Sequence, residues 1–130
     1  MQLEHFAIQV PDPQSMADWY VKHLGFTVAR SWEEPSFARF LKSSTGAVMI
    51  EIYRNPAVPV PDYSTMSPLH LHLAFISSNP TAERDRLVKA GAHVAEDVTT
   101  TPSGDQILML RDPWNIPIQF VKRVEPMLRK

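Results

Sequence analysis

The chain has 130 residues, 44% of them hydrophobic, with no cysteine and a formal net charge of −1, and a chain of this length buries a sufficient core without disulfides. The near-neutral charge and scattered lysines and arginines exclude a basic nucleic-acid-binding surface, and no segment approaches the roughly 18 apolar residues of a membrane span. We therefore expect one soluble, cytoplasmic domain over residues 1–130 whose partners are small molecules, with no nucleic acid and no membrane.

The first part of the chain predicts a strand, a helix and three further strands. Residues 5–10 alternate between apolar and polar side chains as a half-buried strand does. A helix is predicted next. Asp12 caps its N-terminus, Pro13 lies in its first turn, and Gly25 ends it. Turn sequences then separate three shorter strands, which we expect in residues 26–32, 36–43 and 47–53.

The second half of the chain repeats this order. It predicts a strand, a capped helix and three strands, in residues 69–77, 79–91, 92–99, 105–112 and 116–123. His5 and Ala7 recur as His72 and Ala74, and "IEI" at 50–52 recurs as "IQF" at 118–120. This internal duplication predicts an α+β fold of two tandem βαβββ modules that form a curved mixed sheet around a central cavity.

The duplication also divides the chain. The modules cover residues 1–54 and 69–124, and a short, solvated C-terminal tail follows. Residues 55–68 join the modules and are rich in proline, which cannot pair inside a sheet. We interpret them as a linker; the alternative is a rim over a binding site, since long loops in compact domains are often functional.

Four side chains occupy matching positions in the two modules. His5 and His72 begin the first strands, and Glu51 and Gln119 lie in the last strands. Two modules related by an approximate two-fold axis turn such residues toward a common centre. Two imidazoles, a carboxylate and an amide oxygen suit a divalent transition metal with about two open positions for a substrate. Either histidine alone is more often an ordinary core or surface residue, and only the symmetry favours the metal.

Other polar and aromatic residues are candidates for contacting a substrate. His70 lies two residues before His72, so we expect both side chains on the same face of the strand, and His70 is a rival ligand or a hydrogen-bonding partner. We prefer His72 because it aligns with His5. Arg39 is a candidate for binding an anionic substrate group. Tyr53 and Trp114 are candidates for lining the pocket, although aromatics at such positions more often fill the core.

The segments "LEHFAIQVPD", "WYVKHLGF", "AVMIEIY", "HLAFIS" and "LRDPWNIPIQFVKR" together resemble the vicinal oxygen chelate superfamily, which includes glyoxalase I, bleomycin resistance proteins and extradiol dioxygenases. The resemblance implies metal ligands at His5, Glu51, His72 and Gln119 and a divalent ion such as Ni, Zn, Mn or Fe. It also implies a homodimer. The last-strand motif of the family ends in Glu, whereas this chain has Gln119.

The resemblance implies a glyoxalase-like, metal-dependent lyase or isomerase acting on a small substrate with vicinal oxygens. Gln119 offers a neutral oxygen but cannot act as a base, so Glu51 is the expected catalytic residue that moves the proton. Three alternatives remain open. The first is a metal-free small-molecule-binding protein of the bleomycin-resistance type. The second is a dioxygenase-like member, which Gln119 disfavours because the metal-binding triad of dioxygenases contains a carboxylate at this position. The third is a non-catalytic subunit with a vestigial pocket.

Overall fold

The computed structural model describes residues 1–128. The chain divides into two compact units, an N-terminal unit (Met1–Asp62) and a C-terminal unit (Tyr63–Lys130). Residues 129–130, the end of the predicted tail, lie outside the described residues. Neither helix of the described part of the chain is long and apolar enough to cross a membrane.

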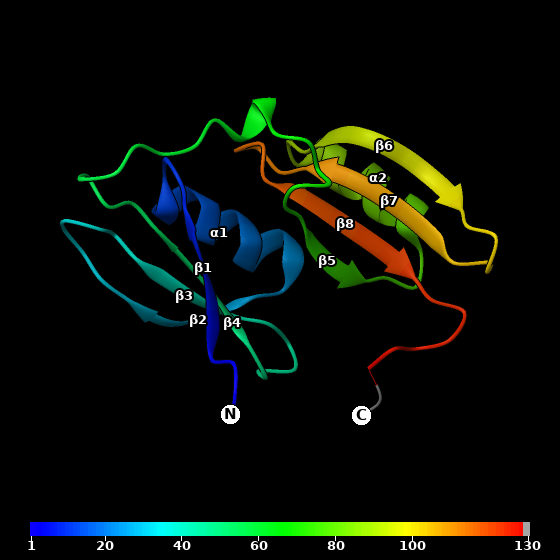
Figure 1. Ribbon diagram of the computed structural model, residues 1–130, viewed down its shortest axis with the longest axis horizontal. Coiled ribbons are helices and arrows are strands. Elements are labelled where there is room, and N and C mark those ends of the chain that lie inside the picture. The colour runs from blue at the N-terminus through cyan, green and yellow to red at the C-terminus, as the bar shows by residue number, and fades with distance from the viewer. Residues whose placement is uncertain (129–130) are drawn as a thin grey trace. The chain divides into compact units, whose positions relative to one another are not determined.

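The N-terminal unit is a four-stranded mixed sheet with one helix packed on it (Figure 1). Its elements are β1 (His5–Gln9), α1 (Pro13–Leu24), β2 (Thr27–Ser31), β3 (Arg39–Lys42) and β4 (Met49–Tyr53). The strand order is β1-β4-β3-β2, in which β1 and β4 run parallel and the other pairs antiparallel. Met16 and Tyr20 of α1 are fully buried, as are Leu41 and Ile52 of the sheet, so the core lies between helix and sheet.

Local sequence explains where α1 begins and ends. The Asp12 side chain accepts a hydrogen bond from the Ser15 N–H at 3.1 Å, which satisfies one of the donors that a helix N-terminus leaves unpaired. Pro13 occupies the first turn, where its missing N–H is not needed. Gly25 ends the helix at φ 72, a left-handed conformation that glycine adopts without strain. The predicted helix is confirmed with both caps.

The C-terminal unit has the same architecture. Its elements are the 3₁₀ turn η1 (Tyr63–Thr65), β5 (Leu73–Ile76), α2 (Pro80–Lys89), β6 (His93–Thr100), β7 (Gln106–Arg111) and β8 (Pro117–Lys122). The strand order β5-β8-β7-β6 repeats that of the first unit, again with a parallel first pair. Asn79 caps α2 by accepting from the Ala82 N–H at 3.1 Å. Pro80 and Leu87 are the buried residues of α2.

The register of the parallel strand pairs shows that the two units match residue for residue. Ala7 of β1 is paired with Glu51 of β4, and Ala74 of β5 is paired with Gln119 of β8. The α+β fold of two βαβββ modules is therefore confirmed, with one four-stranded mixed sheet in each module.

The first strand of the second module is shorter than predicted. It begins at Leu73 instead of residue 69, because the preceding residues form a turn. The His70 N–H donates to the Ser67 carbonyl at 3.0 Å, and the Ser67 hydroxyl accepts from the Leu69 N–H at 3.2 Å. Alternation of leucine and histidine imitates a strand here, but Ser67 and Pro68 favour a turn.

Side chains of the sheets hold both ends of the segment that joins them. Gln9 is buried; its amide donates to the Val58 carbonyl and accepts from the Asn55 N–H at 3.0 Å. The first residues of the segment are therefore fixed on the N-terminal unit.

Arg111 of β7 performs the same task in the C-terminal unit. Its guanidinium donates to the carbonyls of Tyr63 at 2.8 Å, Met66 at 2.6 Å and Asn115 at 3.1 Å. Because two of these backbone oxygens, those of Tyr63 and Met66, belong to η1 and the residue after it, the Arg111 side chain links η1 to β7; the third, that of Asn115, belongs to the turn between β7 and β8.

Candidate functional site

The N-terminal unit brings two of the predicted ligands to one face of its sheet. His5 is paired with Met49, and Ala7, two residues further along β1, is paired with Glu51. Side chains two residues apart in a strand share a face, and so do paired residues of adjacent strands. His5 and Glu51 therefore project from the same face, and both side chains are half-buried.

The His5 ring is held on two sides. Its Nδ1 lies 2.9 Å from a Glu4 carboxylate oxygen, and its ring meets that of Phe40 edge to face at 5.2 Å. Because a carboxylate accepts hydrogen bonds, Nδ1 carries the hydrogen and Nε2 of the neutral ring keeps its lone pair. A histidine whose Nδ1 donates to a carboxylate while Nε2 stays available has the arrangement of many metal ligands.

The C-terminal unit positions its two predicted ligands in the matching way. His72 directly precedes β5, and Ala74, two residues further on, is paired with Gln119. The His72 Nδ1 lies 2.8 Å from the Pro68 carbonyl oxygen, which can only accept, so Nε2 again keeps its lone pair. Both histidines thus present the same nitrogen.

The two predicted oxygen ligands, Glu51 and Gln119, make no side-chain hydrogen bond or ion pair with the described residues. Both side chains are half-buried. Imidazole nitrogens and carboxylate and amide oxygens are ligand types that suit a divalent transition metal, and each unit carries one predicted nitrogen ligand and one predicted oxygen ligand. Within residues 1–128, no group of three or more His, Cys, Asp or Glu side chains is placed to hold a metal ion.

Two hollows of the N-terminal unit share Trp32 and Phe40, and Glu51 lines one of them. A hollow of about 300 Å³ is lined by Trp32, Ser36, Ala38, Phe40, Glu51 and Tyr53. A second, of about 250 Å³, is lined by Glu4, Ala29, Arg30, Trp32, Phe40 and Met49. Tyr53, a predicted lining residue, is thus on the same hollow as Glu51. Sequence reasoning missed Phe40, although it lies beside the buried Leu41 in β3 and alternation places it on the opposite face.

Arg39 contacts the loop that leads into β3. Its Nη1 donates to the carbonyls of Trp32 at 2.7 Å and Phe37 at 3.1 Å, and the side chain is 13% exposed. Phe37 has φ 50, an unfavourable backbone conformation for a bulky residue. Arg39 therefore stabilises a strained loop; its predicted contact with an anionic substrate group stays a prediction.

His70 and Trp114 lie in turns. Because β5 begins at Leu73, the expectation that His70 shares a strand face with His72 is wrong; His70 is exposed in the turn before the strand. Trp114 is half-buried in the turn between β7 and β8. The buried Asp112 carboxylate organises that turn by accepting from the N–H groups of Trp114 and Ile116, both at 2.9 Å.

Comparison with known proteins places this arrangement in a family. The Glyoxalase/Bleomycin resistance protein/Dioxygenase superfamily matches residues 2–120 of the chain. No curated protein sequence matches significantly.

Several solved structures have a similar fold. A glyoxalase family protein from Enterococcus faecalis is 25% identical with a TM-score of 0.72, covering 93% of this chain and 97% of that one. An antibiotic binding protein from a Streptomyces strain is 18% identical with a TM-score of 0.70, covering 94% and 95%. A glyoxalase I mutant from Zea mays is 18% identical with a TM-score of 0.75; the match covers 95% of this chain and 46% of that one. Because the family matches nearly the whole length of this chain and the structure contains the two βαβββ modules, the chain belongs to the glyoxalase/bleomycin resistance protein/dioxygenase superfamily.

Proposed function

We propose that the protein is a glyoxalase-like lyase or isomerase that binds a divalent metal ion through His5, His72, Glu51 and Gln119 and acts on a small substrate with vicinal oxygens. The observation that supports this most strongly is the matched pair. In each unit a histidine whose Nδ1 is hydrogen-bonded to an oxygen lies two residues before an alanine that is paired with a half-buried residue, Glu51 or Gln119, whose side chain has no hydrogen-bond partner among the described residues.

The proposal requires the two pairs to meet at one ion, either within one chain or in a homodimer. Imidazole nitrogens combined with carboxylate and amide oxygens favour Ni, Zn, Mn or Fe over Ca or Mg. A single carboxylate leaves the set with an excess positive charge when an ion is bound, which favours an anionic intermediate.

Glu51 is the residue that would move the proton. When bound, a divalent ion would polarise a carbonyl of the substrate and stabilise negative charge on its paired oxygens. Glu51 is the sole carboxylate of the donor set and lies in a hollow large enough to admit a small substrate. It would take the proton from the hydroxyl-bearing carbon next to the carbonyl and return it to the former carbonyl carbon, while the hydroxyl proton passes to the former carbonyl oxygen. Gln119 would contribute a neutral oxygen and no proton transfer.

A metal-free small-molecule-binding protein is the second candidate. The two hollows share the aromatic walls Trp32 and Phe40, which suits the binding of a flat apolar compound. A similar fold in an antibiotic binding protein is consistent with this alternative. The two candidates differ in whether a metal ion binds.

Equilibrium dialysis against Ni, Zn, Mn and Fe(II) tests the proposal. We expect the wild-type protein to bind one ion per set of four ligands, and His5→Ala combined with His72→Ala to weaken binding at least about 100-fold. His93→Ala, which removes an exposed histidine of β6, is the matched control and should bind as the wild type does. Equal binding by the wild type and the double variant would refute the metal site.

A further inference from the structure

We propose that Arg111 is a positioning residue of the candidate metal site. It fixes the chain that precedes β5, so that the Pro68 carbonyl holds the His72 ring with its Nε2 atom free to bind a metal ion. The inference rests on the proposed function only where it takes Nε2 of His72 as a metal ligand. The effect of Arg111 on the His72 ring can be measured without any metal.

The half-buried Arg111 side chain has backbone oxygens as its hydrogen-bond partners. Its Nη1 donates to the carbonyls of Tyr63 and Asn115, and its Nη2 donates to that of Met66. No carboxylate pairs with this guanidinium within the described part of the chain. Because a guanidinium is planar and carries its donors in fixed directions, it holds the carbonyls of two chain segments in one arrangement.

The bond from Arg111 to Met66 lies close in the chain to the oxygen that binds His72. Met66 is followed by Ser67 and Pro68, and the Pro68 carbonyl oxygen lies 2.8 Å from Nδ1 of His72. The His70 N–H donates to the Ser67 carbonyl at 3.0 Å, which closes a turn around Pro68. The proline ring also fixes φ at this position. The place of the Pro68 oxygen therefore depends on where Met66 is held.

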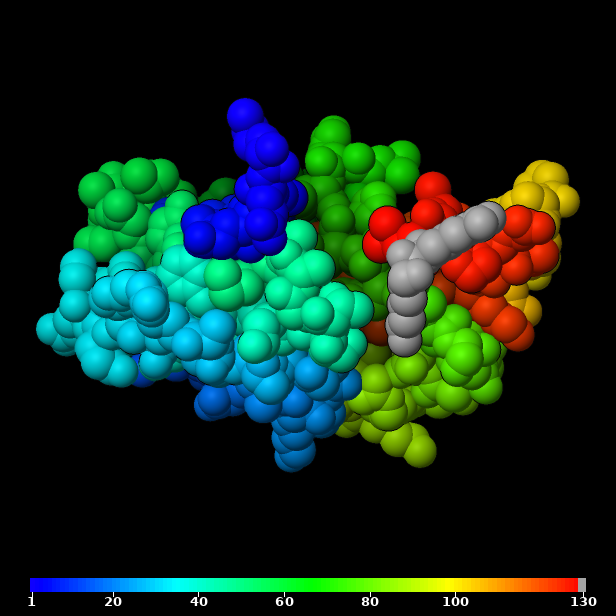
Figure 2. Space-filling view, turned by 90° about the horizontal axis from the view of Figure 1, so that it is seen from below, coloured from blue at the N-terminus to red at the C-terminus, as the bar shows by residue number. Residues whose placement is uncertain are grey.

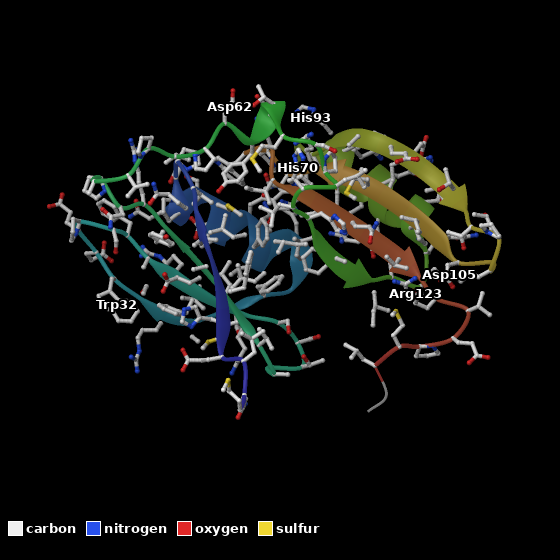
Figure 3. All side chains as sticks on the ribbon, viewed as in Figure 1. Trp32, Asp62, His70, His93, Asp105 and Arg123 are labelled. Carbon is white, nitrogen blue, oxygen red and sulfur yellow. The ribbon has the colours of Figure 1, made fainter. Side chains whose placement is uncertain are left out.

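The chain between Met66 and His72 has little packing of its own. None of residues 66–72 is buried, Leu69 is 87% exposed, and the exposed His70 is labelled in Figure 3. This part of the chain, green in Figure 2, reaches the surface. A turn without a buried apolar side chain gains little from packing, so its conformation depends on its hydrogen bonds. The bonds from Arg111 are charge-assisted and thus stronger than those between neutral groups.

Strand register places Arg111 on the side of the sheet that carries Gln119. Met109 is paired with Gln119, and Arg111 lies two residues further along β7. Side chains two residues apart in a strand share a face. One side chain thus links the strand face of the predicted oxygen ligand, Gln119, to the turn that holds the predicted nitrogen ligand, His72.

The N-terminal unit lacks this link and provides a matched control. The counterpart of Arg111 there is Lys42: each is paired with the residue that begins the last strand of its sheet, Pro117 in β8 and Met49 in β4. The Lys42 side chain has no hydrogen-bond or ion-pair partner among the described residues. His5 needs no distant segment, because its Nδ1 partner is the carboxylate of the preceding residue. We therefore expect Lys42 to be dispensable where Arg111 is not.

Long-range ¹H–¹⁵N correlation spectra of the metal-free protein, recorded near pH 8.5, where imidazole is neutral, report the tautomer of His72. A histidine side chain free in water favours the hydrogen on Nε2, whereas a ring held by the Pro68 carbonyl carries it on Nδ1. We expect the Nδ1–H tautomer in the wild type and in Lys42→Met. Most rings should switch in Arg111→Met, and fewer in Arg111→Lys, which keeps the charge. An unchanged tautomer in Arg111→Met, with native chemical shifts in β7 and β8, would overturn the proposal.

Ser67→Ala tests the same connection without altering Arg111, and it decides the question if Arg111→Met fails to fold. It removes the hydroxyl that accepts from the Leu69 N–H, so it should loosen the turn and shift the His72 tautomer in the same direction. The wild-type tautomer in both Ser67→Ala and Arg111→Lys would count against the proposal.

Zinc dialysis on the same variants separates this inference from the proposed function. Arg111→Met should bind zinc at least about tenfold more weakly than the wild type, and Lys42→Met should bind it equally well. If the wild type binds no metal and the His72 tautomer still depends on Arg111, the proposed lyase is refuted and the role of Arg111 in holding His72 is supported. If zinc binds equally to the wild type and to Arg111→Met, the positioning role alone is refuted.

Discussion

Glu51 and Gln119 occupy equivalent positions in the two sheets and differ by one functional group. Exchanging that group in either residue changes the charge of the donor set while keeping its shape. We expect Glu51→Gln to weaken metal binding at least about tenfold, because the site loses its negative charge, and Gln119→Glu to strengthen it by a similar factor. Competition dialysis with a chromophoric chelator measures both. Changes in the same direction would show that the two residues do not share an ion.

Asn115 holds a left-handed backbone position in the turn between β7 and β8. It adopts φ 68, and its N–H donates to the Asp112 carbonyl at 2.9 Å. Asparagine tolerates the left-handed conformation, whereas a β-branched side chain does not. Asn115→Val should therefore lower the free energy of unfolding by about 1–2 kcal/mol, and Asn115→Gly should change it by less than about 1 kcal/mol. Urea denaturation measures both; equal losses would show that the side chain and not the backbone matters.

For single residues, the sequence predicted the positions that repeat between the modules and did not predict hydrogen bonds that depend on the folded backbone. His5 and His72 could be matched because their spacing to the paired residues repeats in the sequence. Their Nδ1 partners were not predicted, because the Pro68 carbonyl is a backbone atom whose position depends on a turn. His70 lies in the same turn and not in the strand, although the alternation of leucine and histidine in residues 69–73 is typical of a strand.

At the scale of elements, both helices use the same start signal, an Asx residue followed by proline. Asp12→Ala and Asn79→Ala should each lower the free energy of unfolding by about 1 kcal/mol, because each removes a hydrogen bond to an N–H group of the first turn. The caps belong to different units and share no partner, so the double variant should lose the sum of the two effects. Thermal and urea unfolding of the three variants provides the check, and a negligible loss in both single variants would contradict the capping role.

Asp105 fastens the segment that follows β8. Its carboxylate accepts from the Val124 N–H at 2.8 Å and pairs with Arg123 at 2.9 Å (Figure 3). The hydrogen bond from Val124, and next the one from Arg123, lowers the pKa of Asp105 below its ordinary value of 3.8. Because the folded pKa is the lower one, the contact stabilises the fold above pH 3.8 and loses this effect as the pH falls through the folded pKa.

We therefore expect hydrogen exchange at the Val124 amide to be protected near neutral pH and to lose protection, relative to neighbouring amides, only below about pH 4. Asp105→Asn should abolish this pH dependence and lower protection at neutral pH. Amide exchange followed by NMR measures it. Protection that is independent of pH in the wild type would contradict the role of the carboxylate.

The boundaries of most elements followed from sequence alone. Asp12 and Gly25 define the first helix, and alternation locates β4, because these signals act over a few residues. The strand β3 begins at Arg39 instead of residue 36, because the turn before it extends to Ser36. The start of β5 was placed too early, since no residue in "LHLHL" signals that the turn after Pro68 extends to the strand. Pairing partners across the sheet, such as Phe40 opposite Glu51, depend on register and became visible only in the structure.

In the whole molecule, the duplication was the feature that the sequence predicted best. One βαβββ pattern, read twice in the sequence, predicted two tandem modules, and the structure shows that their two four-stranded sheets share one strand order and matching registers of the parallel pair. The pattern did not predict the asymmetry between the halves. The contacting rings of Trp32 and Phe40 lie in the N-terminal unit, and the Arg111 guanidinium binds the joining turn in the C-terminal unit. Duplicated modules diverge at such positions because the fold does not constrain them.

The proposed function requires the two units to supply one metal ion with equivalent ligands. Anomalous scattering from crystals grown with Zn or Ni, measured at the absorption edge of the metal, tests this requirement. We predict one anomalous peak per donor set, about 2.0–2.3 Å from Nε2 of His5, Nε2 of His72, and oxygens of Glu51 and Gln119. A peak bound by His70 or by only one unit, or the absence of any peak near these four side chains at saturating metal, would contradict it.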